Sequence, residues 1–106
     1  MAWIYLAVAG LLEIGWPLGL KIAANPESRT RGIIMAVLFM SGSGALLWLA
    51  QRQIPMGTAY AVWTGIGAVG TLIVGILLYG EPSTLMRLGS ASLIVIGIIG
   101  LKLAHG

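Results

Sequence analysis

The residue with the clearest chemical potential is Glu13, which lies inside an apolar run from Met1 to Leu20 that carries no other charge. A carboxylate at the centre of a membrane span costs roughly 2.5–3.5 kcal/mol on insertion scales, so an acid retained there is a functional-site candidate. No basic residue lies at membrane depth in the other apolar runs. We therefore expect Glu13 to carry a proton or to take its counter-ion from outside the protein. A structural acid, hydrogen-bonded inside a helix bundle, is the alternative.

One negative charge that accepts either a proton or a cationic ligand has a specific chemical use. The two occupants compete for the same site. Competition at one site, combined with alternating access to the two sides of a membrane, gives proton-coupled cation antiport. The position of Glu13 therefore favours this mechanism over a purely structural role.

The neighbours of Glu13 on a helix are suited to holding a ligand. Residues three and four positions apart share a helix face, so Trp16 and Pro17 lie on the same stripe as Glu13. Trp16 offers a flat ring and an N–H donor. Pro17 has no N–H, which frees the backbone carbonyl of Glu13 and permits a kink.

Two later stretches add polar and aromatic groups. Ser43, between Gly42 and Gly44, is placed to donate a hydrogen bond to a carboxylate or an indole; a bond back to its own helix is the alternative. Tyr60 and Trp63 are three apart and form two aromatic walls with polar handles. Interfacial anchoring is the alternative, and it suits Tyr60 better than Trp63, which lies two turns inside its apolar run.

Glycines mark two further features. Gly65 and Gly67 weaken the centre of the third apolar run, which indicates a hinge for access switching, although close packing explains them equally well. Gly89 and Gly97 lie in the fourth run, which holds no acid or aromatic residue. Small residues at such spacing predict a helix–helix interface, which we assign to dimerisation.

The composition identifies the elements that carry these residues. The chain is 58% hydrophobic and 8% charged, whereas soluble domains carry about 25% charged residues. Charged and turn residues divide it into four apolar segments, about 2–22, 32–50, 57–79 and 84–104, each close to the ~20 residues that cross ~30 Å of hydrocarbon. We predict an all-α membrane protein, a single domain over 1–106 with four transmembrane helices and both termini on one side.

The composition also excludes several functions. Cysteine is absent, which excludes disulfides, thiol catalysis and thiolate metal sites. No nucleophile, base and orienting group converge, so we expect no enzymatic activity, no cofactor and no metal. The basic residues lie between apolar runs and do not cluster on one face, which argues against nucleic acid as a partner. Glu81 follows the third run and precedes a proline, and we expect it to be a solvated loop acid.

The six basic residues give a weak signal for orientation. Two lie on the side of the termini and four on the opposite side: Arg52 and Lys102 against Lys21, Arg29, Arg31 and Arg87. This split favours a cytoplasmic location for the first and third loops, but insertion in both orientations is the alternative. The four segments show no internal repeat, whereas many transporters pair two inverted halves around a midplane site. Two copies in opposite orientations would supply the missing inversion.

The four spans, the acid in the first span and the sequence PMGTAYAVWTGIG at residues 55–67 resemble the small multidrug resistance family over essentially the whole chain. Trp16, the same third-span motif and GIIGLK at residues 97–102 are similar to its guanidinium-exporter subtype. Quaternary-ammonium exporters typically have glycine at the Trp16 position. The resemblance implies an antiparallel, dual-topology homodimer in the bacterial inner membrane that exchanges protons for guanidinium.

The resemblance also implies roles for five residues. Glu13 matches the carboxylate shared by proton and substrate, Trp16 and Ser43 match its hydrogen-bonding neighbours, and Tyr60 and Trp63 match the aromatic lining. The chemistry agrees, because guanidinium is planar, pairs bidentately with carboxylates and stacks on aromatic faces. The expected partners are protons, a small guanidinium-type cation, the lipid bilayer and a second copy of the chain.

Three departures from the subtype's pattern bear on substrate size. Pro17 stands where a small non-proline residue is usual, Gly42 and Gly44 stand where bulkier residues are common, and the first loop lacks the usual run. A roomier site would admit substituted guanidines such as guanylurea and biguanides. Two alternatives stay open: a broader exporter of quaternary ammonium and other lipophilic cations, and a non-transporting or heteromeric membrane subunit.

Overall fold

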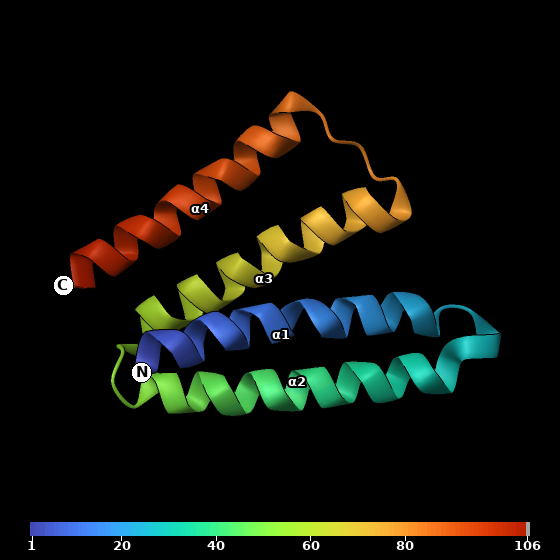
Figure 1. Ribbon diagram of the computed structural model, residues 1–106, viewed down its shortest axis with the longest axis horizontal. Coiled ribbons are helices and arrows are strands. Elements are labelled where there is room, and N and C mark those ends of the chain that lie inside the picture. The colour runs from blue at the N-terminus through green and yellow to red at the C-terminus, as the bar shows by residue number, and fades with distance from the viewer. Residues whose placement is uncertain (106) are drawn as a thin grey trace.

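The computed structural model describes residues 1–105. They form four long helices and one short 3-10 turn: α1 (Ala2–Ala23), η1 (Pro26–Ser28), α2 (Arg29–Gln51), α3 (Met56–Tyr79) and α4 (Leu85–His105) (Figure 1). Each long helix has the length and apolar composition needed to cross a membrane. The prediction of an all-α fold with four candidate transmembrane helices is confirmed.

The second helix begins earlier than the sequence predicted. We expected it from residue 32, but α2 begins at Arg29, because charge opposes burial in lipid and does not oppose helix formation. The preceding turn supports this start. The Ser28 hydroxyl donates to the Ile22 carbonyl at 2.8 Å, and Arg29 Nε donates to the Ala23 carbonyl at 3.3 Å. These bonds satisfy carbonyls that the end of α1 leaves open.

Helices α1 and α2 form the tightest pair in the fold and lie antiparallel, side by side (Figure 1). Glycines make this possible. A Cβ added at Gly19 would lie 2.7 Å from the backbone nitrogen of Ala36 and 2.8 Å from the carbonyl oxygen of Gly32. A Cβ added at Gly32 would meet the backbone of Gly19 and Ala23 in turn. The two backbones therefore touch, as small residues allow in membrane helices.

Helix α3 packs against α1 where glycines of one helix face isoleucine side chains of the other. Gly10 faces Ile66, and Gly70 faces Ile14. The buried core lies where the beginnings of α1 and α3 meet the end of α2, and its members are Ala2, Leu6, Ala50, Ile54, Ala59 and Val62. This packing fixes the relative heights of α1, α2 and α3 and so positions the side chains at their centres.

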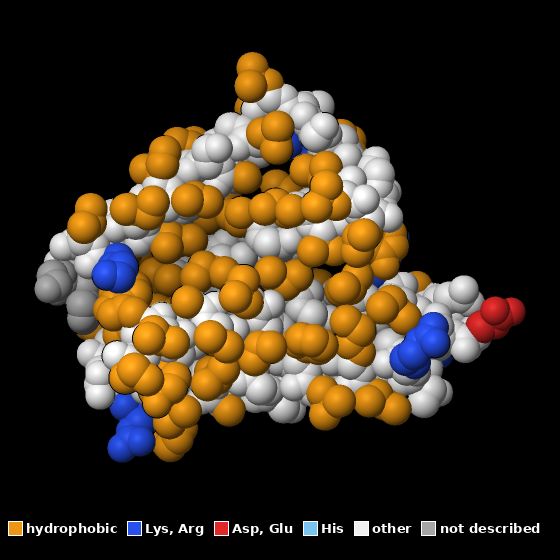
Figure 2. Space-filling model, in the orientation of Figure 1, with side chains coloured by type: hydrophobic (Ala, Val, Ile, Leu, Met, Phe, Trp, Pro, Cys, Tyr) orange, Lys and Arg blue, Asp and Glu red, His pale blue; other side chains and the backbone are white. Residues whose placement is uncertain are grey.

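Helix α4 is attached differently. Within residues 1–105 its backbone packs only against α3, and the two helices diverge toward the 80–84 loop (Figure 1). Most of α4 is exposed, and a Cβ added at Gly89 or Gly97 would have no atom within 4 Å. The surface across α3 and α4 is largely apolar (Figure 2). A single chain therefore leaves one face of α4 without a protein neighbour.

The α1–α2 contact predicts a position-specific effect on stability. We expect Gly32→Ala to lower the free energy of unfolding by about 1–3 kcal/mol, the range typical of overpacking, because the added methyl group meets backbone atoms that cannot move aside. Denaturant unfolding in detergent, followed by far-UV circular dichroism, measures the change. Gly44→Ala on the same helix is the control, since its added Cβ has nothing within 4 Å. Equal stability of the two variants would contradict the prediction.

Candidate functional site

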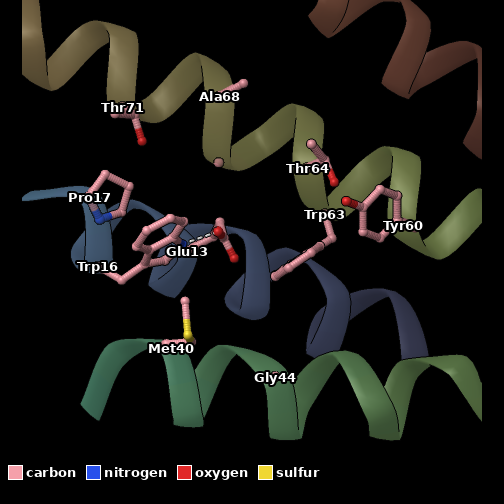
Figure 3. Close-up of a pocket in the computed structure, with 11 residues that line it drawn as sticks. Glu13, Trp16, Pro17, Met40, Gly44, Tyr60, Trp63, Thr64, Ala68 and Thr71 are labelled. Atoms are coloured by element: carbon pink, nitrogen blue, oxygen red, sulfur yellow. Dashed lines mark hydrogen bonds between the residues drawn. The ribbon is translucent and has the colours of Figure 1, made fainter. Parts of the chain in front are cut away.

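A cavity of about 500 Å³ lies at the centre of α1, α2 and α3 (Figure 3). Its lining combines one carboxylate with aromatic, hydroxyl and small side chains. The lining residues are Glu13, Trp16, Pro17, Met40, Gly44, Tyr60, Trp63, Thr64, Gly67, Ala68 and Thr71. No lysine or arginine is among them. Four of the five residues proposed from the sequence line this cavity, and the fifth, Ser43, hydrogen-bonds two of them.

The Glu13 side chain is half-buried and lies against α3. A Cβ added at Gly67 would be 2.5 Å from Glu13 Cγ, so the glycine provides the space that the acid occupies. The indole Nε1 of Trp16 donates to Glu13 Oε1 one turn along α1 (Figure 3). Among the described residues, Glu13 forms no salt bridge. The hydrogen-bond donor that this carboxylate has within the described residues is therefore a neutral indole N–H, with the Ser43 hydroxyl at the limit of a second bond.

Ser43 is fully buried and joins three helices. Its hydroxyl lies 2.7 Å from the Ala9 carbonyl on α1, and Trp63 Nε1 on α3 donates to the same oxygen at 2.7 Å. Glu13 Oε2 is 3.5 Å away, at the limit of a hydrogen bond. A hydroxyl has one proton to donate, so Ala9 is its principal acceptor. Our expectation that Ser43 donates to an indole was wrong in direction, because an indole N–H can only donate.

The two aromatic residues of α3 stand together at the cavity. The ring centroids of Tyr60 and Trp63 are 5.5 Å apart and the planes are tilted by 53°, a favourable geometry for an aromatic pair. Trp63 is half-buried and held by Ser43. Tyr60 is 55% exposed, so it stands at the open side of the cavity.

The glycines proposed as a hinge both lie in close packing. A Cβ added at Gly65 would be 2.9 Å from Ile98 Cδ1 on α4, and Gly67 faces Glu13. Their role as a hinge stays a prediction. The interface role of Gly89 and Gly97 also stays a prediction, although both positions are open within the chain.

Several lining residues escaped our sequence-based prediction. Thr64, Ala68 and Thr71 follow Tyr60 and Gly67 along one stripe of α3 at helical spacing. That spacing was visible in the sequence and would have found them. The contribution of Met40 from α2 was not visible, because it depends on the register between two helices.

Comparison with known proteins places the chain in a family. Residues 1–99 match the family described as Small Multidrug Resistance protein. The chain belongs to the small multidrug resistance family. It is 55% identical, over 98% of its length and 99% of the relative's, to a guanidinium exporter of Yersinia pseudotuberculosis. The guanidinium exporter of Escherichia coli K12 is 55% identical and that of Citrobacter freundii 53% identical, each over 98% of both chains.

The bridge through Ser43 gives a second stability prediction. We expect Ser43→Ala to lower the free energy of unfolding by about 1–3 kcal/mol, because the Trp63 N–H loses its acceptor in a buried place. Denaturant titration in detergent measures the change. Ser41→Ala, an exposed serine on the same helix, should unfold like the parent protein. A Ser43→Ala variant as stable as Ser41→Ala would show that the bridge contributes nothing.

Proposed function

We propose that this protein exports guanidinium and substituted guanidines in exchange for protons, with Glu13 holding proton and cation in alternation. The observation that carries the proposal is a carboxylate in a membrane-depth cavity whose lining contains no basic side chain. The guanidinium exporters that share 55% of its residues support the choice of cation.

The cavity offers guanidinium each interaction that this cation uses. The ion is planar and presents N–H groups that pair with both oxygens of a carboxylate, which Glu13 provides. Its flat face stacks on aromatic rings, which Trp63 and Tyr60 provide at the same cavity. Trp16 donates to one oxygen of Glu13, and the Ser43 hydroxyl lies 3.5 Å from the other.

Proton coupling follows from having one carboxylate for two occupants. A protonated Glu13 has no charge to hold a cation, and a cation on Glu13 excludes the proton. Release of one on one side of the membrane therefore permits binding of the other. The export direction follows from a proton concentration that is higher outside the cell than inside.

The single chain also favours assembly, and we propose an antiparallel, dual-topology homodimer in the bacterial inner membrane. Three helices line the cavity while α4 stands apart from it. Tyr60 at the rim is more than half exposed, so a second copy is needed to enclose the cation. Opposite insertion of the two copies fits the weak charge bias of the loops and supplies the inverted repeat that alternating access uses.

The size of the cavity favours a second candidate, a broader exporter of lipophilic cations. The cavity volume is about 500 Å³. A water molecule, with one heavy atom, occupies about 30 Å³ in the liquid, so guanidinium, which has only four heavy atoms, fills a small part of this cavity. Gly44 has open space beside it, and Pro17 forms part of the wall. The same room is what guanylurea or a biguanide requires, so size alone does not exclude either substrate class.

Removal of the Glu13 charge tests the mechanism. We expect Glu13→Gln to abolish guanidinium binding in the Glu13 cavity. We also expect it to reduce proton-driven guanidinium uptake to the level of protein-free liposomes. The amide keeps the shape of the side chain but holds neither a titrating proton nor a negative charge. Glu27→Gln, at an exposed acid of η1, is the matched control and should transport normally. Retained exchange by Glu13→Gln would refute the mechanism.

The same assay separates the two substrate classes. In parallel uptake measurements on the parent protein, we expect guanidinium, guanylurea and a biguanide to be exchanged faster than tetrapropylammonium. Guanidines pair with the two oxygens of Glu13 through N–H groups, whereas a quaternary ammonium has no hydrogen to donate. Faster exchange of tetrapropylammonium would assign the protein to the broader class of exporters.

The dimer proposal predicts a specific effect on α4. We expect Gly97→Leu to shift the protein from dimer to monomer in detergent while leaving its helical content unchanged. A Cβ added at this position has no described atom within 4 Å, so the larger side chain has no clash within the described part of the chain. Light scattering coupled to gel filtration measures the mass. Ala45→Leu makes a similar enlargement at an exposed position of α2 and should remain dimeric. A dimeric Gly97→Leu would remove α4 from the interface.

A further inference from the structure

A second cavity continues from the Glu13 cavity toward the end of the membrane span. Its volume is about 160 Å³, and it lies between the later turns of α1 and α3. Its lining residues are Ile14, Pro17, Leu18, Lys21, Thr71, Val74, Gly75, Tyr79 and Glu81. Pro17 and Thr71 line both cavities, and Figure 3 shows them facing each other from α1 and α3. Lys21 lies about 12 Å beyond Glu13 along α1, at 1.5 Å per residue.

Glu81 is held at this cavity by the end of α3. Gly80 ends the helix with φ 65°, a left-handed conformation that favours glycine. The chain then turns back, and the Glu81 N–H donates to the Gly75 carbonyl at 3.1 Å. A Cβ added at Gly75 would lie 2.5 Å from Glu81 Cδ. The carboxylate therefore rests on the helix surface where only glycine leaves room, although 47% of its side chain stays exposed.

The second cavity has the same two chemical components as the first, a carboxylate and an aromatic ring. Here the chain's own cations occupy both. Arg87 Nη2 pairs with Glu81 Oε1 at 3.0 Å, and Lys21 Nζ lies 5.4 Å from the ring centroid of Tyr79. A guanidinium group is thus already bound to a carboxylate at the mouth of a site that, under the proposed function, handles guanidinium ions.

The hold of Arg87 on Glu81 is incomplete. The pair has one hydrogen bond, between Nη2 and Oε1, whereas a strong arginine–carboxylate pair has two. Arg87 Nε is buried and has no hydrogen-bond partner among the described residues. A free guanidinium ion has no side chain to constrain it and can use both oxygens of Glu81. The new pair carries the same charge as the pair that it replaces, while the Arg87 side chain, already 36% exposed, moves into water.

From these contacts we propose that Glu81 and Tyr79 form an outer cation station, at which a guanidinium ion displaces Arg87 on its way between water and Glu13. Thr71, in the neck between the two cavities, offers a hydroxyl to the passing ion. The proposal rests on the proposed function of the Glu13 cavity and adds a second binding site and a route to it.

The test uses guanidinium exchange by the full-length protein in liposomes, together with equilibrium guanidinium binding in detergent. We expect Glu81→Gln to lower kcat/KM for exchange about tenfold, the lower end of what a charged cleft adds to the on-rate. Its equilibrium affinity at Glu13 should stay unchanged, which also shows that the variant is folded. Thr71→Val should slow exchange in the same way, with Thr30→Val, an exposed threonine, as its control.

The decisive comparison is Arg87→Gln, because a displacement role and a structural role predict opposite signs. Removal of the resident guanidinium should raise kcat/KM, and the double variant with Glu81→Gln should behave like Glu81→Gln alone. If Arg87→Gln and Glu81→Gln slow exchange alike, the pair is structural and the station is refuted. Unchanged exchange by Glu81→Gln refutes it as well. If the parent protein neither binds nor exchanges guanidinium, the proposed function fails, and the station with it.

Discussion

The structure depends on one constraint, the cost of a carboxylate at membrane depth when the chain supplies no cation for it. That cost is roughly 2.5–3.5 kcal/mol on insertion scales, and neutral donors offset only part of it. Trp16 donates to one oxygen of Glu13, while the hydroxyl of Ser43 is engaged chiefly by Ala9. The remaining electrostatic deficit is available to any occupant that neutralises the charge. Under the proposed function, this incomplete solvation of the Glu13 carboxylate is what favours the binding of a proton or a cation.

Glycine residues determine where the Glu13 carboxylate lies in the helix bundle. Gly19 and Gly32 bring the backbones of α1 and α2 into direct contact. Gly67 leaves the space that the Glu13 side chain fills, while Gly44 leaves open space across the cavity. The same residue type therefore fixes one pair of helices and opens a chamber beside it. Helix α4 packs closely on α3 at Gly65, but it has no comparable contact at its own Gly89 or Gly97 among the described residues.

The sequence and the family resemblance named the residues of the site, but the detailed contacts between helices depend on a register that the sequence did not give. The hydrogen bond between Trp16 and Glu13 and the ring contact of Tyr60 with Trp63 each follow from a spacing of three residues. The bridge from Trp63 through Ser43 to Ala9 crosses three helices, so its geometry depends on how α1, α2 and α3 pack together. The early start of α2 was missed for another reason. The charged residues before position 32 indicate where the lipid-embedded part begins, whereas the helix itself already begins at Arg29.

Glu13 and Glu81 both lie near aromatic rings, but the media around the two carboxylates differ in polarity. This difference matters for the proposed transport. Glu81 lies near water, where an ion pair is worth about 0–1 kcal/mol, so its pairing with Arg87 resists exchange only weakly. Glu13 lies in a less polar medium, where the same pair of charges interacts more strongly, and no side chain of the cavity competes for it. Under the proposed route, a cation that moves from Glu81 to Glu13 therefore exchanges a weak partner for a strong one. In the proposed mechanism, protonation of Glu13 reverses that preference, because it removes the negative charge at the deeper site.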